Sequence, residues 1–226
     1  MPRPKNRDAV LKVIHASWQL FKERGYSGTS YSDIAEKSCV SRPTVQRYFP
    51  KKELLLSENL KRLRQRAESI AVREFPDVIN PLGKLYLLGQ IYLAALLCCP
   101  ESRRFFCDVL NDRELTDKTI TADMFWSAQF VTPALTNETI DEDARDGVIV
   151  SMGGLYELMF HCIRHNREFD PFRQMMPVAI ASAPLFGMEA EACRKLMYAC
   201  EIPRDALRLY AQEAYDSIGV ETISKK

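Results

Sequence analysis

The stretch VSRPTVQRYFPKKELLL, residues 40–56, places several hydrogen-bonding side chains close together. The guanidinium groups of Arg42 and Arg47 and the carboxamide of Gln46 can each form paired hydrogen bonds with the edge of a nucleic-acid base. The hydroxyl of Thr44 can contact a base or a phosphate. This chemistry suits recognition of double-stranded DNA. The alternative is an ordinary charged helix face whose side chains contact only water.

Three helices are expected to position these side chains. The first, residues 7–24, ends in a basic last turn followed by a glycine, Gly25. The second begins at Ser30, and the acidic Asp33 three positions later predicts a capping box. The third begins after Ser41, which can cap it, and has a proline in its first turn, where no backbone N–H is needed.

The second and third helices are short and lie a few residues apart, which is the arrangement of a helix-turn-helix. The second helix of this motif enters the major groove of DNA with its amino-terminal residues at the base edges. Residues 1–73 contain 16 Lys or Arg and 7 Asp or Glu, net +9, although the whole chain is only +1. The remainder is net −8, so the sequence predicts one part that contacts a polyanion and one that does not.

The amino-terminal segment resembles a known family. Over residues 7–56 it is similar to the amino-terminal domain of TetR-type (tetracycline-repressor-like) transcriptional regulators. The resemblance is carried by an ordered series: Phe21, Gly25-Tyr26, Ser30, Asp33-Ile34-Ala35, Val40-Ser41, Arg47-Tyr48-Phe49, and Lys52-Glu53 with Leu54 and Leu55. The remaining three-quarters of the chain resembles the family only in length and helical composition.

Two sets of DNA contacts are expected. The side chains expected to face the groove are Arg42, Thr44, Gln46 and Arg47. The side chains expected to meet phosphates are Ser30, Tyr48 and Lys52. A basic arm is expected to enter the neighbouring minor groove or to lie along the backbone, and it contains Arg3, Lys5 and Arg7. Partial burial is the alternative for Tyr48, and Val45 and Phe49 are expected to be core residues.

Two residues depart from the family pattern. Cys39 stands where the family usually has glycine, so a turn that needs a positive φ there would be strained by about 1 kcal/mol. Gln46 stands where an aromatic residue usually contacts phosphate, and glutamine can instead pair with adenine. The preferred DNA sequence is therefore expected to be particular to this chain.

The rest of the chain is also expected to be helical, which makes the fold all-α. A long connecting helix, residues 52–74, has apolar residues at spacings of three and four and would extend about 30 Å. Prolines beyond it mark a break, and the expected domains are residues 1–74 and residues 80–220. Further helices are expected at 82–98, 101–112, 121–135, 140–165, 171–185, 188–201 and 203–218.

The second domain is expected to dimerise. The resemblance implies a homodimer that brings two recognition helices onto a near-palindromic DNA site through a four-helix bundle. The helix 140–165 is the first candidate for this bundle, with 171–185 or 203–218 as its partner. Its Gly153-Gly154 pair indicates either close approach of another helix or a packing notch within the chain.

The second domain is also expected to bind a small, largely apolar effector, since aromatic and methionine side chains gather in its sequence. For each of these side chains, plain core packing is the alternative. The pocket candidates are Phe106, Phe125, Trp126, Phe130, Tyr156, Met159 and Phe160.

Other function classes have little support. The sequence contains no glycine-rich phosphate loop and no serine-hydrolase or zinc-protease motif, so neither an enzyme nor a cofactor is expected. His161 and His165 are one helical turn apart but have no evident third ligand, so no metal is expected. The longest apolar run, residues 85–99, is too short to cross a membrane and contains Gln90, so a buried helix in a cytoplasmic protein is expected.

These features together predict a ligand-responsive repressor that blocks a promoter. The resemblance implies that the connecting helix 52–74 shifts when the effector binds, which changes the separation of the two recognition helices. The alternatives are a DNA-binding activator without an effector, and a helical ligand-binding or interaction protein whose helix-turn-helix has lost DNA binding.

Overall fold

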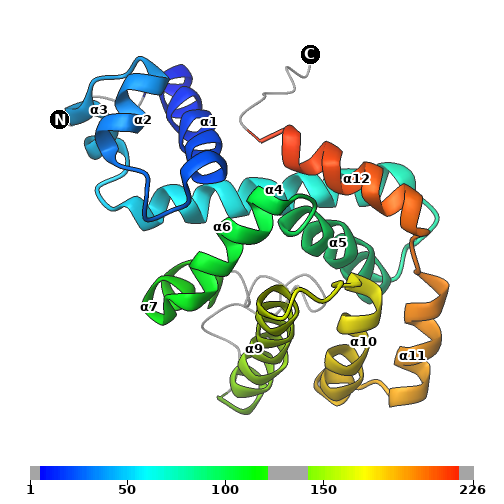
Figure 1. The fold of residues 1–226 in the computed structure, drawn as a ribbon. Coiled ribbons are helices and arrows are strands. Elements are labelled where there is room, and N and C mark those ends of the chain that lie inside the picture. Colours follow the sequence, from blue (N-terminus) through cyan, green and yellow to red (C-terminus); the bar gives the residue numbers. More distant parts are fainter. Residues whose placement is uncertain (1–5, 122–141, 219–226) are drawn as a thin grey trace.

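The structure, a computed structural model, describes residues 6–121 and 142–218, and every regular element within them is helical (Figure 1). The elements are α1 (Arg7–Arg24), α2 (Tyr31–Ser38), α3 (Arg42–Tyr48), α4 (Lys52–Glu74), α5 (Pro81–Leu96), α6 (Pro100–Asn111), α7 (Arg113–Thr116), the π-helix η1 (Asp117–Thr121), α9 (Glu142–Arg164), α10 (Pro171–Ser182), the 3-10 helix η2 (Ala183–Phe186), α11 (Ala190–Ala199) and α12 (Arg204–Asp216). The all-α prediction is confirmed.

Helices α1, α2 and α3 form a compact unit at one end of the molecule (Figure 1). The apolar stripe of α1 is buried, with Ile14 and Phe21 fully inaccessible and Trp18 2% exposed. The ring of Phe21 stacks on Phe105 of α6 at 5.8 Å, so this core continues into the neighbouring helix. The chain leaves α1 at Gly25 with φ of 77°, as the basic turn and glycine predict.

The long helix α4 runs from this unit along α5, which lies at the centre of the remaining helices (Figure 1). The predicted apolar stripe of α4 is buried throughout: Leu56, Leu60, Leu63, Ala67 and Ile70 are all at most 3% exposed. Among the described residues, no single helix has the length and apolar composition to span a membrane, and only α5 with α6, bent by 101°, meets both criteria as a pair.

Gln90, the polar residue in the apolar run of α5, is 1% exposed and fully bonded. Its amide nitrogen donates to the carbonyl of Cys200 at 2.8 Å, and its amide oxygen accepts from the backbone N–H of Ile202 at 3.1 Å. Both partners lie in the connection between α11 and α12. The side chain therefore joins the central helix to the carboxy-terminal helices.

The carboxy-terminal helix α12 folds back across α5 and α4 (Figure 1). The guanidinium of Arg73 donates two hydrogen bonds of 2.7 Å to the carboxylate of Glu213. The hydroxyl of Tyr210 donates to Glu74 at 3.1 Å. These contacts join the end of α4 to α12.

Most predicted helices beyond residue 80 exist, with their ends moved by at most three residues. The 171–185 prediction ends early because α10 passes into the 3-10 turn η2 at Ala183. The short helix α7 and the π-helix η1 were not expected. The predicted helix 121–135 lies outside the described residues from residue 122 onward.

The two glycines of α9 face outward. Among the residues that the structure describes, a Cβ atom added to Gly153 or Gly154 would meet no atom within 4 Å. No described residue therefore packs closely on this pair, and both predicted explanations for it stay open.

Candidate nucleic-acid interface

The start of α2 is held by a reciprocal cap. The hydroxyl of Ser30 accepts from the backbone N–H of Asp33 at 3.2 Å, and the Asp33 carboxylate accepts from the backbone N–H of Ser30 at 2.8 Å. The predicted capping box is thus confirmed. The hydrogen bonds from Ser30, helped by nearby Arg24, hold the pKa of Asp33 below its ordinary value. The Ser30 side chain remains exposed at the surface, where it was predicted to meet a phosphate.

Cys39 makes the turn between α2 and α3. Its backbone is left-handed, with φ of 53° and ψ of 33°, and its N–H bonds back to the carbonyl oxygens of Ala35 and Glu36. This is the positive-φ position that the comparison with the family's usual glycine predicts. A side chain with a Cβ is strained there, by about 1 to 2 kcal/mol for a typical residue.

The start of α3 differs from its prediction in one hydrogen bond. Ser41 occupies the capping position but caps no backbone N–H, because its hydroxyl donates to the hydroxyl of Thr44 at 2.9 Å. The proline that follows needs no partner in the first turn. Arg42 is exposed and its guanidinium donates to the hydroxyl of Ser32, at 3.3 Å, on α2. The two helices are thereby joined across the turn.

The two faces of α3 have opposite roles. Val45 is inaccessible and Phe49 is 8% exposed, so the inner face fastens the helix to the core as predicted. Gln46 and Arg47 are exposed on the outer face. The guanidinium of Arg47 lies 5.0 Å from the centre of the Tyr48 ring, which steadies it near the surface.

Tyr48 is 5% exposed, so the predicted alternative of burial holds for its ring. Its hydroxyl accepts from the backbone N–H of Asn6 at 3.1 Å and from the guanidinium of Arg47 at 3.3 Å. The side chain of Asn6 in turn caps α1 by accepting from the N–H groups of Asp8 and Ala9. Tyr48 therefore ties the recognition helix to the start of α1.

Lys52, predicted to meet a phosphate, is half-buried and has partners within the chain. Its ammonium donates to the carbonyls of Tyr26 at 2.8 Å and Thr29 at 2.9 Å, and lies 4.2 Å from the centre of the Tyr26 ring. Burial lowers the pKa of this ammonium. Lys52 thus fixes the loop between α1 and α2 to the first turn of α4.

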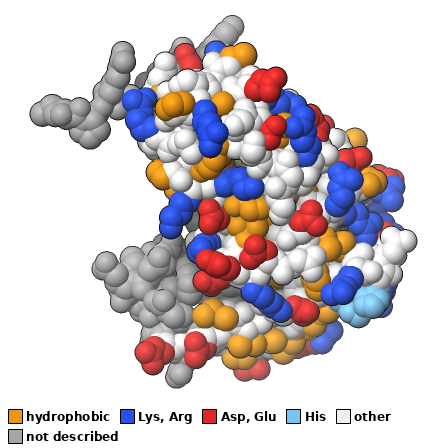
Figure 2. Space-filling view, turned by 60° about the vertical axis from the view of Figure 1, so that its left-hand side comes forward, with side chains coloured by type: hydrophobic (Ala, Val, Ile, Leu, Met, Phe, Trp, Pro, Cys, Tyr) orange, Lys and Arg blue, Asp and Glu red, His pale blue; other side chains and the backbone are white. Residues whose placement is uncertain are grey.

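Of the predicted groove-facing residues of α3, Arg42, Gln46 and Arg47 are exposed and Thr44 is partly exposed, and Ser30 is exposed at the capping position before α2. Figure 2 shows Lys and Arg side chains on the surface of this upper part of the molecule. Arg3 and Lys5 of the predicted basic arm lie outside the described residues. Sequence reasoning did not identify Asn6 as a cap, although an asparagine directly before a helix is a recognised signal for one.

The predicted effector-pocket residues are partly described. Phe106, Tyr156 and Met159 are at most 7% exposed. Phe160 is partly exposed, and the guanidinium of Arg164 lies 5.6 Å from its ring centre. The remaining candidates lie outside the described residues: Phe125, Trp126 and Phe130.

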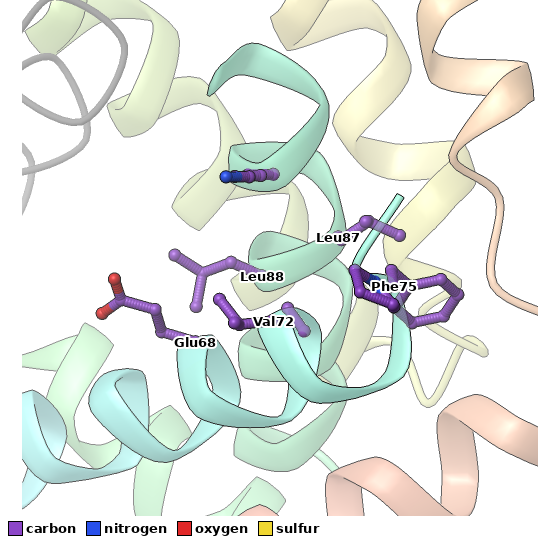
Figure 3. A pocket seen from close by; sticks show the side chains of 8 residues that line it. Glu68, Val72, Phe75, Leu87 and Leu88 are labelled. Atoms are coloured by element: carbon purple, nitrogen blue, oxygen red, sulfur yellow. The ribbon is translucent and has the colours of Figure 1, made fainter. Parts of the chain in front are cut away.

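One small cavity lies where α4 and α5 meet, lined among others by Glu68, Val72 and Phe75 from one side and Leu87 and Leu88 from the other (Figure 3). Its volume is about 40 Å³. Pockets that enclose an organic ligand are usually about 300 Å³ or larger, so this cavity is too small for one.

Comparison with known proteins agrees with this geometry. Residues 13–58 match the family model described as "Bacterial regulatory proteins, tetR family". The comparison with curated proteins finds no match. The matched segment contains the whole of α2 and α3 together with the adjoining parts of α1 and α4. Residues 13–58 therefore form a helix-turn-helix domain of the TetR family type, which supports a DNA-binding transcriptional regulator.

Proposed function

We propose that this protein is a homodimeric repressor that blocks a promoter by binding a near-palindromic operator, and that a small, largely apolar molecule releases it. The observation that carries this proposal is the outer face of α3. Arg42, Gln46 and Arg47 are exposed there, while Val45 and Phe49 hold the opposite face in the core. A helix held in this way can enter the major groove while its contacts with the core stay intact.

Base readout is assigned to Arg42, Thr44, Gln46 and Arg47. Ser30, exposed at the start of α2, is assigned to a phosphate. Lys52 uses two of its three N–H donors within the chain, so one remains for a phosphate. Tyr48 acts mainly through the position of α3, since its hydroxyl already holds Asn6 and Arg47.

A dimer is needed because one short recognition helix contacts too few base pairs for useful specificity. The outward face of α9 supports this role. Val150 is 73% exposed, Ile149 40% and Leu158 37%, and the two adjacent glycines leave the helix surface flat. A groove of about 920 Å³ runs between α9 and α10 beside these residues.

The alternative partner, the predicted 203–218 helix, is a weaker candidate. Leu207, Ala211 and Ala214 of α12 are buried, and α12 packs on α5 and α4 of its own chain. Its apolar face is therefore already buried against its own chain. We assign the four-helix bundle to α9 and α10 of each subunit.

We assign release from DNA to a shift of α4. This helix begins beside the unit formed by α1, α2 and α3, and it packs against α5 and α12. A ligand that moves α4 changes the distance between the two recognition helices. The coupling is reciprocal, so an effector that weakens DNA binding must bind the DNA-bound form more weakly by the same factor.

Fluorescence anisotropy with random-sequence duplex at increasing salt tests the DNA contacts. The affinity should fall steeply with the logarithm of salt concentration, because several phosphates release counterions. An affinity that does not change with salt would contradict the proposal.

A reporter gene placed downstream of a selected site distinguishes a repressor from an activator. Deletion of the gene for this protein should raise reporter expression if the protein is a repressor and lower it if the protein is an activator.

Selection of bound sequences from a random duplex pool tests base readout. The variants Arg47→Ala and Gln46→Ala should each lose preference at particular base pairs, at a cost of about 1 to 3 kcal/mol per contact. Arg113→Ala is the matched control, since that side chain is 84% exposed on α7, away from α3. An unchanged preferred site in both α3 variants would remove these assignments.

A further inference from the structure

Two adjacent thiols lie at the corner between α5 and α6. α5 ends at Leu96, and Cys98 and Cys99 precede α6, with Cys99 at its capping position. Both are free and partly exposed, whereas Cys193 and Cys200 are buried. Burial and the neighbouring Cys99 thiol together raise the pKa of Cys98 to about 12. The two thiols belong to adjacent residues in the connection between α5 and α6.

Cys98 opens onto a cavity of about 420 Å³. Its lining includes the apolar side chains of Leu97, Phe169 and Leu207 as well as charged ones, among them Arg103, Glu168 and Arg204. This volume falls within the range of pockets that hold organic ligands, roughly 300 to 1,000 Å³. A compound attached to the thiols therefore has room for a ring beside Cys98.

Cys99 contacts a residue that packs against α1 of the α1–α3 unit. Its thiol donates to the hydroxyl of Tyr215 on α12, at 3.7 Å. Tyr215 is 3% exposed, and its ring lies edge-on to Trp18 of α1 at 5.2 Å between centres. The carbonyl of Tyr215 accepts a hydrogen bond from the indole N–H of Trp18 at 3.3 Å, and the ammonium of Lys22 lies 4.4 Å from the Tyr215 ring centre.

We propose that Cys98 and Cys99 form a binding site for trivalent thiophilic compounds of the organoarsenical class, and that occupation of this site weakens DNA binding through Tyr215 and Trp18. Soft sulfur ligands favour soft acceptor atoms, and two neighbouring thiols can hold one such atom together. A bound arsenic atom takes the place of the thiol hydrogen that now reaches Tyr215. The packing of α12 against α1 must then change.

The binding reaction is a condensation. An organoarsenic oxide, R–As=O, forms one As–S bond with each thiol, and its oxygen leaves as water with the two thiol protons. Arsenic remains trivalent and both sulfur atoms keep their oxidation state, so neither an oxidant nor a reductant takes part. A dithiol in solution should reverse the reaction by exchange.

Phenylarsine oxide tests the site on the full chain. Intact mass spectrometry should show one phenylarsenic adduct per chain, removed by 1,2-ethanedithiol. The adduct should be lost in Cys98→Ser and in Cys99→Ser, and retained in the control Cys107→Ser, whose thiol is also partly exposed but has no adjacent cysteine. Circular dichroism checks that each variant is folded, with Cys98→Ala and Cys99→Ala as second variants. An adduct that persists in the folded Cys98 and Cys99 variants overturns the proposal.

The effect on DNA rests on the proposed function and has its own measurement. With a duplex selected by the untreated protein, phenylarsine oxide should weaken binding about tenfold, a typical size for coupling between two sites. The Cys98→Ser and Cys99→Ser variants should bind DNA equally with and without the reagent. An adduct that leaves DNA affinity unchanged overturns the coupling. If the untreated protein binds no duplex, the proposed function is contradicted. The mass measurement still tests whether the two cysteines bind the reagent.

Discussion

At the scale of single residues, polar side chains with several partners position the DNA-binding surface. The side chains of Tyr48 and Lys52 each bond to backbone atoms more than 20 residues away, and neither residue is exposed. Residues chosen from the sequence as phosphate contacts thus have a second role inside the protein. A hydroxyl or ammonium in a family motif can hold the recognition helix in place as well as touch DNA.

The left-handed turn at Cys39 predicts a stabilising substitution. Cys39→Gly should raise the free energy of unfolding by about 1 kcal/mol, because glycine adopts φ of 53° without the strain of a Cβ atom. Chemical denaturation measures the change. Cys39→Ala, which keeps the Cβ atom and loses only the exposed thiol, is the matched control and should change stability little. Equal stabilisation by both would show that the thiol, and not the backbone, is responsible.

The buried amide of Gln90 predicts a destabilising substitution. Gln90→Met keeps the size of the side chain but leaves the carbonyl of Cys200 and the N–H of Ile202 without their partner. The expected loss is about 2 to 4 kcal/mol, since each unpaired buried group costs about 1 to 3 kcal/mol. Thermal and chemical unfolding measure it. Gln65→Met on the exposed side of α4 is the control and should have an effect near zero.

At the scale of elements, the helix-turn-helix is built from local signals and then locked by neighbours. The capping box at Ser30 and Asp33 starts α2, the left-handed Cys39 ends it, and Arg42 bonds back to Ser32 across the turn. Lys52 then joins the whole unit to α4. The orientation of α3 therefore depends on α1 and α4 as well as on the turn itself.

The capping box predicts a pH dependence. The pKa of Asp33 is lowered in the folded protein, so its contribution to stability is present above the ordinary value of about 4 and is lost as pH falls through the lowered value. Asp33→Asn should therefore destabilise the protein near neutral pH, and the difference from the natural protein should shrink in acid. Thermal unfolding across a pH series tests this.

A control in the first turn of another helix isolates the cap. Asp205→Asn on α12 alters a carboxylate that is 99% exposed. It should show a much smaller pH-dependent difference. If the Asp33 and Asp205 variants behave alike, the capping hydrogen bonds are not the source of the effect.

At the scale of the whole molecule, α12 connects parts that are far apart in the sequence. It contacts α4 through Arg73 and Glu213, α5 along its apolar face, and α1 through Tyr215 and Trp18. Its apolar face is consequently unavailable for another subunit. The proposed dimer therefore uses the outward face of α9 instead.

The proposed dimer predicts the effect of a charge on α9. Val150→Arg places a guanidinium at the centre of the apolar face of α9. Because Val150 is 73% exposed, the substitution should leave the fold intact and convert dimers to monomers. Analytical ultracentrifugation measures the mass. Affinity for a selected two-half-site duplex should fall at least about tenfold, because both half-sites must be held by one molecule.

Leu209→Arg is the matched control for this change. Leu209 is 71% exposed on α12, which the proposal places outside the dimer interface. This variant should remain dimeric and bind the same duplex as before. Loss of the dimer in Leu209→Arg but not in Val150→Arg would move the interface to α12.

The sequence by itself determined most of the helices, the core stripe of α4 and the capping box at Ser30. These features depend on residues within a few positions of one another, so periodicity and turn chemistry reveal them. Only the tertiary structure decided the partners of Tyr48, Lys52 and Gln90, the outward direction of Gly153 and Gly154, and the contact between Cys99, Tyr215 and Trp18. Those contacts join segments more than 20 residues apart, and no local pattern specifies which distant group will complete a hydrogen bond or cover a helix face.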